Sequence, residues 1–489
     1  MNNNFSINKD NGRYLPGLDE SESGKFSISS NKQDHINFKV RNTAARGEEH
    51  LLKNQFSDDV KTFSKTSNHT LNYEKRSDYA STIHSVTFAG LFLFSFFLYF
   101  RPYEWIPAFS GFDSLTFIIG LLTLLSFFAI QLNAEWRLWG RETEVWLVLG
   151  ILLYAIISIP IAKDPGLAWN TLNDTFIKVV LVFICLAAVI TIKTRLDALI
   201  LLSVSIGAKL GYDAFTMFQA GEFNVEGYRV KVDLGGMFGN PNDLAIHFVI
   251  FSPIAIARAL AARSFISRLL WLAAAFFMVA GILVTQSRGG FLGLLASSGV
   301  LIWKFGKQHR AKALIGGLVA FLFVLLLMPG NYGLRMASIF IPSLDPVGSA
   351  SERREALERS LIVTLRNPQG IGIGNSRLVG VRDHETHNAY TQVSSELGWL
   401  SFIFYALFLY LPLRRLKRIA NTYYLEKSAE RWPYYYAIGI TARIVGYLVS
   451  SFFASVAYQW YIYYPIAYAI GLERIVNQSG QTQDKFNYI

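Results

Sequence analysis

Three short polar motifs stand at the start of apolar runs in this sequence, and each carries residues that can bind an anion. They are FGNPND with Asn240 and Asn242, QSRGG with Ser287 and Arg288, and THNAY with His387 and Asn388. The first turn of a helix has free backbone N–H groups and partial positive charge, so it favours anions. Ordinary helix capping explains any one motif alone. Three together, with an arginine and a histidine among them, favour a shared anion-binding site.

Charged residues also occur inside the apolar runs. Lys209 and Asp213 are four residues apart, Arg443 sits within GITARIVGYLV, and Glu396 follows the THNAY motif by about two helical turns. Burying one such charge in a bilayer costs roughly 2.5–3.5 kcal/mol on insertion scales, so it normally faces a partner or a polar cavity. We therefore expect these four residues to have structural or supporting roles. The pairs Lys209–Asp213 and Glu396–Arg443 are one alternative, and the wall of a polar cavity is the other.

The composition indicates a membrane protein. Of 489 residues, 52% are hydrophobic, and 46 Lys and Arg face 35 Asp and Glu, for a net charge of +11. The basic excess lies in short loops between apolar runs, where it reports membrane topology, so we expect membrane lipids and no nucleic acid as partners. The single cysteine, Cys185, excludes a disulfide within the chain.

The elements that must position the polar motifs are membrane helices. Runs near twenty residues predict an all-α polytopic membrane protein with about twelve spans. We expect them near 84–100, 113–132, 144–161, 174–192, 196–218, 243–261, 267–285, 289–304, 312–329, 389–412, 433–451 and 453–472. The predicted parts are a disordered cytoplasmic tail at 1–80, nine helices at 81–329, a large external loop domain at 330–388, three helices at 389–475, and a cytoplasmic C-terminal tail at 476–489.

Alternate loops should face the same side of the membrane. The loops RLWGRE, KTRLD, RALAARSFISR, KFGKQHRAK and RRLKRIAN are the more basic set, which predicts that they are cytoplasmic. The opposite set comprises the RPYEW loop, the AKDPGLAWN loop, residues 219–242, the SRGG turn and residues 330–388. This assignment places all three polar motifs on the external face and the N-terminus in the cytoplasm.

The long external loop has a pattern of its own. Residues 351–366 show an amphipathic helical pattern, with Arg353 and Arg354 among its basic residues. The GIGIG stretch at 370–374 lacks the Gly-Lys-Ser/Thr of a P-loop, so we interpret it as a tight turn that brings backbone close to a ligand.

These motifs together resemble the signature of a known superfamily. The SRGG turn, an arginine fifteen residues before the proline of NPQGIGIGN, and HNAYTQVSSELGWLSFIFYALF are similar to the O-antigen ligase and O-antigen polymerase superfamily over residues 235–412. RPYEWIP and GNPNDLA are similar to a branch of O-glycosylation ligases of exopolysaccharide loci. The resemblance implies a C-type membrane glycosyltransferase in the bacterial cytoplasmic (inner) membrane, with its active site on the periplasmic face.

The resemblance also implies the substrates. The donor would be a polyprenyl-diphosphate-linked glycan, and the acceptor a hydroxyl of a lipid A core sugar, a growing glycan or a protein. The reaction would need no metal and no other cofactor. Arginine binds phosphate through its planar fork, so Arg288 and Arg353 would bind the diphosphate, with Arg354 as a neighbouring candidate.

The remaining site residues take their roles from the same resemblance. His387 matches the position of a general base for the acceptor hydroxyl. Asn388 would orient His387 or a sugar hydroxyl, and Asn240, Asn242 and Ser287 would complete the substrate-binding face. Ligase and polymerase share these motifs, so both remain open. A flippase for lipid-linked glycans is the alternative from another class, although transporters often show two similar halves with matching interrupted helices, which the sequence lacks.

Overall fold

The computed structural model describes residues 84–112, 114–133, 142–306, 311, 315, 349–380, 386–425 and 431–486. The predicted tail at 1–80, all but residue 315 of the predicted ninth helix at 312–329, and residues 330–348 and 381–385 of the predicted external loop lie outside these described residues. Within them the fold is all-helical, and the one β-bridge is an isolated pair between Val225 and Arg229.

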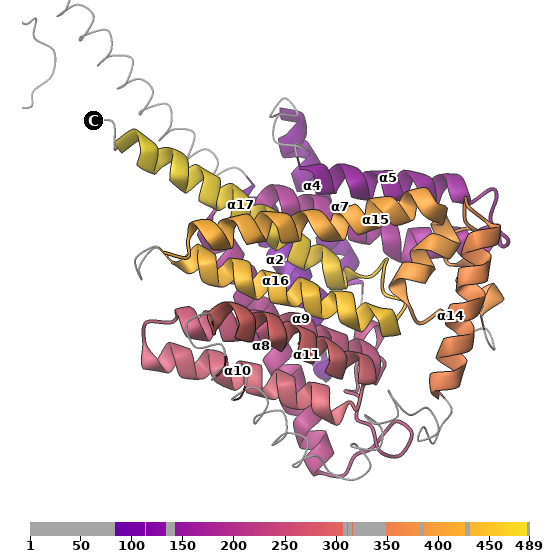
Figure 1. Cartoon of the computed structure of the whole chain (residues 1–489), viewed down its shortest axis with the longest axis horizontal. Helices are drawn as coiled ribbons and strands as arrows, with labels where there is room; N and C mark the ends of the chain where they lie inside the picture. The colour runs from indigo at the N-terminus through magenta and orange to yellow at the C-terminus, as the bar shows by residue number, and fades with distance from the viewer. Residues whose placement is uncertain are drawn as a thin grey trace, which may run out of the picture. The chain divides into compact units, whose positions relative to one another are not determined.

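The helices of the described part follow one another with short connections (Figure 1). In chain order they are α2 (Ser85–Phe100), α3 (Pro102–Trp105), η1 (Pro107–Phe109), α4 (Leu115–Asn133), α5 (Thr143–Ser158), α6 (Pro165–Thr171), the π-helical η2 (Leu172–Phe176), α7 (Ile177–Val189), α8 (Lys193–Gln219), η3 (Gly236–Phe238), α9 (Pro241–Ala261), α10 (Phe265–Val284), α11 (Arg288–Phe305), α14 (Ser349–Arg366), η5 (Asn375–Val379), α15 (Ala389–Thr422), α16 (Trp432–Ser450), η6 (Ser451–Phe453) and α17 (Trp460–Phe486).

The protein is a polytopic membrane protein. Among the described residues, eight helices are long and apolar enough to cross a membrane, and α5 is a shorter apolar helix. Helices α11 and α17 also lie where the eighth and twelfth spans were predicted, so the total of twelve stays a prediction. One boundary differs: α17 continues to Phe486, whereas the sequence analysis ended the last span at 472 and began a C-terminal tail at 476.

Helix α9 is at the centre of the packing. It contacts α8, α10, α11, α16 and α17. Of its apolar stretch, 78% is buried inside the protein, compared with 28% for α4 and 33% for α10. Figure 1 shows α9, α16 and α15 side by side, with α14 crossing near the end of α15. The helices that meet the hydrocarbon are therefore peripheral ones such as α4 and α10, and α9 brings its polar N-terminus to the middle of the bundle.

Helix α15 is interrupted at Gly398, whose φ of 75° is left-handed. The backbone groups released by the break bond to residues at and just before the predicted tight turn: Ser395 O accepts from Ile371 N (3.0 Å), and Trp399 N donates to Pro368 O (3.0 Å). A Cβ at Gly398 would lie 2.2 Å from Pro368 O, so only glycine fits this contact. An unpaired backbone group is costly at membrane depth, and this exchange of hydrogen bonds makes the break tolerable.

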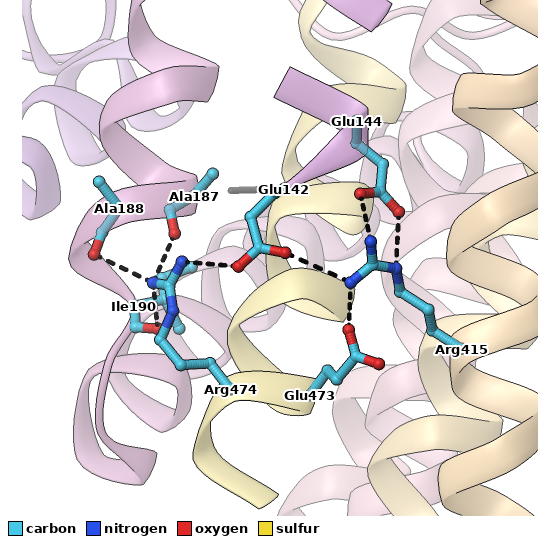
Figure 2. Close-up of polar contacts among 8 residues, drawn as sticks. All are labelled: Glu142, Glu144, Ala187, Ala188, Ile190, Arg415, Glu473 and Arg474. Atoms are coloured by element: carbon cyan, nitrogen blue, oxygen red, sulfur yellow. Dashed lines mark hydrogen bonds and ion pairs between the residues drawn. The ribbon is translucent and has the colours of Figure 1, made fainter. Parts of the chain in front are cut away.

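At one end of the bundle, two arginines bind three glutamates and tie four helices together (Figure 2). Arg415 of α15 forms ion pairs with Glu144 of α5 (3.0 Å), with Glu142 (3.3 Å) and with Glu473 of α17. Arg474 binds Glu142 (3.2 Å) and donates to carbonyl oxygens at the end of α7, at distances from 2.7 to 3.4 Å. These are the carbonyls that a helix C-terminus leaves without a partner, so Arg474 caps α7.

Candidate functional site

A cavity of about 850 Å³ lies at the end of the helix bundle opposite to the ion pairs of Arg415 and Arg474. Its ionisable lining residues are Arg101, Asp174, Asp243, Arg377, His387 and Glu396. Its amide side chains are Asn170, Asn240, Asn242, Gln392 and Gln459, and its aromatic side chains are Tyr103, Phe453, Tyr458, Trp460 and Tyr461. Rings, amides and carboxylates beside cations form a wall that can hold hydroxyl groups, sugar faces and an anion together.

The cavity is built mainly from loops that are far apart in the sequence. Lining residues come from the RPYEW loop, the helix after AKDPG, residues 236–243, the Gly-rich segment near 374 and the THNAY motif. The sequence analysis assigned these loops to one side of the membrane. Their convergence on one cavity agrees with that grouping, while the compartment that they face remains a prediction.

The first polar motif caps α9, as the sequence predicted. The Asn240 side-chain oxygen accepts from the backbone N–H groups of Asn242 and Asp243, each at 2.9 Å, and Pro241 occupies the first turn. The Asn240 amide donates to the Asp243 carboxylate. The side chains of Asn240, Asn242 and Asp243 all line the cavity. Capping and cavity lining are thus combined in one turn of helix.

The second motif is joined to the first. Ser287 caps α11 by accepting from Gly290 N (3.2 Å), and its hydroxyl bonds to Asn242 Oδ1 (3.0 Å). Arg229 Nη2 donates to the same oxygen (2.8 Å). Ser287 and Arg288 are both buried and neither lines the cavity. The structure therefore places the Ser287–Arg288 motif behind the cavity wall, in contact with it through Asn242.

The third motif separates its two polar residues. Asn388 is buried, and its side-chain oxygen caps α15 by accepting from Tyr390 N (2.9 Å) and Thr391 N (3.1 Å). His387 precedes this cap with a left-handed backbone (φ 51°), and its half-buried side chain lines the cavity. The cap fixes the start of α15, and the left-handed residue before it turns the imidazole out of the helix. Of this motif, His387 alone lines the cavity.

Glu396 of α15 also lines the cavity. Its buried carboxylate accepts from Gly374 N (2.8 Å) and Ser376 N (3.1 Å), which attaches the Gly-rich segment to α15 just before the break. The predicted alternative, an ion pair with Arg443, is not found. The guanidinium of Arg443 is fully buried over the rings of Tyr468 (5.0 Å) and Phe251 (5.6 Å), and its nitrogens have no hydrogen-bond partner among the described residues.

The other predicted charges lie away from the cavity. Lys209 and Asp213 form the expected ion pair (2.6 Å), and the Lys209 ammonium also lies 3.9 Å from the centre of the Trp105 ring. Arg353 and Arg354 are on α14, within the predicted helix, and neither lines the cavity. Arg354 is exposed and pairs with Glu358 at 3.0 Å.

The cavity has two arginines that the sequence analysis did not select, Arg101 and Arg377. Arg101 belongs to the RPYEW loop, and Arg377 follows the Gly-rich segment. No local signal identifies Arg101 as a cavity residue, because the segment that packs against its guanidinium, at Gly236, is distant in the sequence. Among the described residues, no group of three His, Cys, Asp or Glu side chains is arranged to hold a metal ion.

Residues 273–406 match the family model described as O-antigen ligase. This segment of the chain is similar to the O-antigen ligase family. This match confirms the resemblance found in the sequence, and it spans Arg288, Arg353, His387 and Glu396. No curated protein matches the chain as a relative. The family supports a membrane enzyme of the O-antigen ligase or polymerase type, which acts on a lipid-linked glycan and an acceptor.

Proposed function

We propose that this O-antigen ligase-type protein transfers a glycan from a polyprenyl-diphosphate carrier to an acceptor hydroxyl in the cavity, without a metal. The acceptor oxygen forms a bond to the anomeric carbon. The bond from that carbon to the diphosphate breaks, and the diphosphate leaves with the bonding electrons. The hydroxyl proton passes to an imidazole nitrogen of His387. The site would face the periplasm of a bacterial inner membrane.

The single observation that carries the proposal is the position of His387. It is the histidine of the family-matched segment that lines the cavity, and the Asn388 cap holds its backbone. A general base must lie within hydrogen-bond reach of the proton it removes, and only a neutral imidazole can accept one.

The leaving group needs cationic stabilisation, because a lipid diphosphate departs with negative charge. The resemblance gives this role to Arg288 and Arg353, and arginine suits it through its fork of N–H donors. Arg288 begins α11 directly after Ser287, which bonds to the cavity-lining Asn242. In this account Arg288 acts on the diphosphate through its positive charge from behind the cavity wall, and the N-terminus of α9 adds its dipole at the cavity.

The test is glycan transfer by purified protein in lipid nanodiscs, with a lipid-linked oligosaccharide and an acceptor supplied. We expect His387→Ala and Arg288→Ala to abolish transfer while the proteins remain monodisperse. His384→Ala, three residues upstream and outside the HNAYTQ motif, is the matched control and should transfer normally. Transfer by His387→Ala at the rate of the unsubstituted protein would remove the base assignment.

Ligase and polymerase are two forms of this proposal, and they differ in the acceptor. The glycan profile of a deletion strain separates them. Loss of all glycan from the acceptor, with lipid-linked chains accumulating, means ligase. A single repeat remaining on the acceptor means polymerase.

The interrupted helix α15 favours a second candidate, a flippase for lipid-linked glycans. Transporters bind substrates at helix breaks near the middle of the membrane. Here the backbone groups of the break are already bonded to residues 368–372. In a reconstituted assay, exposure of lipid-linked glycan without new glycosidic bonds would support the flippase.

A further inference from the structure

Arg101 occupies a junction that fixes its backbone. It ends α2 and begins α3, with left-handed dihedral angles (φ 50°, ψ 58°), and its N–H donates to Phe97 O at 3.2 Å. Pro102 follows in the first turn of α3. A non-glycine residue in this conformation is uncommon and indicates a position that the surrounding structure holds in place.

The side chain of Arg101 is held on two of its three nitrogens. Nη2 pairs with Glu104 Oε1 (2.7 Å), and Nε donates to the Tyr103 hydroxyl (3.0 Å). Glu104 is itself fixed, because its other oxygen accepts from Gly235 N (2.8 Å). At the end of α3, the Trp105 ring stacks against Lys209 of α8. The guanidinium is therefore set in one orientation before any substrate arrives.

The third nitrogen, Nη1, is buried and has no hydrogen-bond partner among the described residues. The Arg101 side chain lines the cavity. Gly236, with φ of 60°, packs directly against Nη1: a Cβ at this position would lie 2.7 Å from that nitrogen. A buried charged donor without an acceptor is costly, so such a group in a cavity wall points to a ligand.

We propose that Arg101 is a substrate-binding residue, which donates through Nη1 to a phosphate oxygen of the lipid diphosphate. This inference rests on the proposed function, since that function supplies the donor. The prepared orientation suits a charge-assisted hydrogen bond, which is stronger than a neutral one. Arg377 lines the same cavity, but its side chain is exposed and is not held in one orientation as that of Arg101 is.

The experiment measures donor KM, acceptor KM and kcat for Arg101→Gln and Arg101→Lys. We expect Arg101→Gln to raise the donor KM about ten- to hundredfold, because a hydrogen bond to a charged group is lost. Acceptor KM should not change. Arg101→Lys keeps the positive charge but loses the planar fork of N–H donors. Its donor KM should therefore lie between those of the unsubstituted protein and Arg101→Gln.

Gly236→Ala tests the same contact without changing Arg101. Its Cβ would displace Nη1, so the donor KM should rise in the direction of Arg101→Gln. Gly227→Ala is the matched control: Gly227 also has positive φ (73°), and nothing lies within 4 Å of its added Cβ. It carries the same type of backbone strain and should leave the donor KM unchanged.

Binding of farnesyl diphosphate to the purified proteins separates this inference from the proposed function. Binding by the unsubstituted protein that Arg101→Gln and Gly236→Ala both weaken supports the contact, even if no glycan is transferred. Binding and donor KM within twofold of the unsubstituted protein in both variants would overturn it. Competition by inorganic diphosphate that is weaker in Arg101→Gln assigns the contact to phosphate. Unchanged competition together with a higher donor KM assigns Arg101 to the glycan and rejects the phosphate contact.

Discussion

Arg415 and Arg101 lie at opposite ends of the helix bundle and show two different uses of arginine. All three guanidinium nitrogens of Arg415 bind carboxylates: Nε and Nη2 bind Glu144, and Nη1 binds Glu142 and Glu473 (Figure 2). Arg101 has two nitrogens bound, and its buried Nη1 has no hydrogen-bond partner among the described residues. A saturated guanidinium has no donor left for a substrate, so its contribution is to stability. A guanidinium that is fixed in orientation but has one nitrogen without an acceptor can still bind a ligand.

The positions of the two ends support the same distinction. Glu396 lines the cavity and Arg415 lies nineteen residues later on α15, roughly 25–30 Å away at 1.5 Å per residue. The Arg415 end joins helices through side-chain ion pairs, whereas the cavity end joins loops through backbone contacts such as those of Glu396 with Gly374 and Ser376. One end is built to hold helices together and the other to present a surface.

The largest effect on stability should come from Arg415→Ala. It leaves the fully buried Glu144 carboxylate without its partner, and removing one member of a buried pair costs about 3–5 kcal/mol. We expect a large fall in the thermal midpoint of the purified protein, with donor KM unchanged at a temperature where it remains folded. Arg101→Gln should show the reverse: little change in midpoint and a raised donor KM. A raised donor KM in folded Arg415→Ala would break the distinction.

Glu396→Ala should have an intermediate effect on both properties. It removes the acceptor of two buried N–H groups, at a cost of about 1–3 kcal/mol, and it loosens the segment that carries Gly374 into the cavity. We expect a lower midpoint and a lower kcat. Glu396→Gln keeps one carbonyl acceptor and should recover part of each. Full activity in Glu396→Ala would show that the Gly-rich segment does not need this anchor.

The smallest effect should come from Lys209→Ala. The Lys209 side chain is 43% exposed, and exposed ion pairs contribute about 0–1 kcal/mol. We expect a thermal midpoint within a few degrees and unchanged transfer, both measured against Asp213→Ala as the partner control. A loss of transfer in both variants would instead show that the Lys209–Asp213 ion pair is needed for the reaction.

Local signals predicted the helix starts well. Asn240 with Pro241 caps α9 as expected, because the capping residue and its N–H partners are adjacent in sequence. The break at Gly398 was not predicted, since its partners lie around Pro368 and belong to a different segment. Arg101 was missed for the same reason: its guanidinium packs against Gly236, which the fold brings to it. Contacts between distant loops decide the site, and a local pattern does not contain them.

The central claim is that transfer takes place in this cavity with His387 as the base. Single-turnover transfer tests it most directly, with lipid-linked donor bound first and acceptor added to His387→Ala and to the unsubstituted protein. The account predicts that both bind donor equally and that transfer by His387→Ala is slower by at least about a hundredfold, as removal of a general base gives. Equal transfer rates in the two proteins would contradict it.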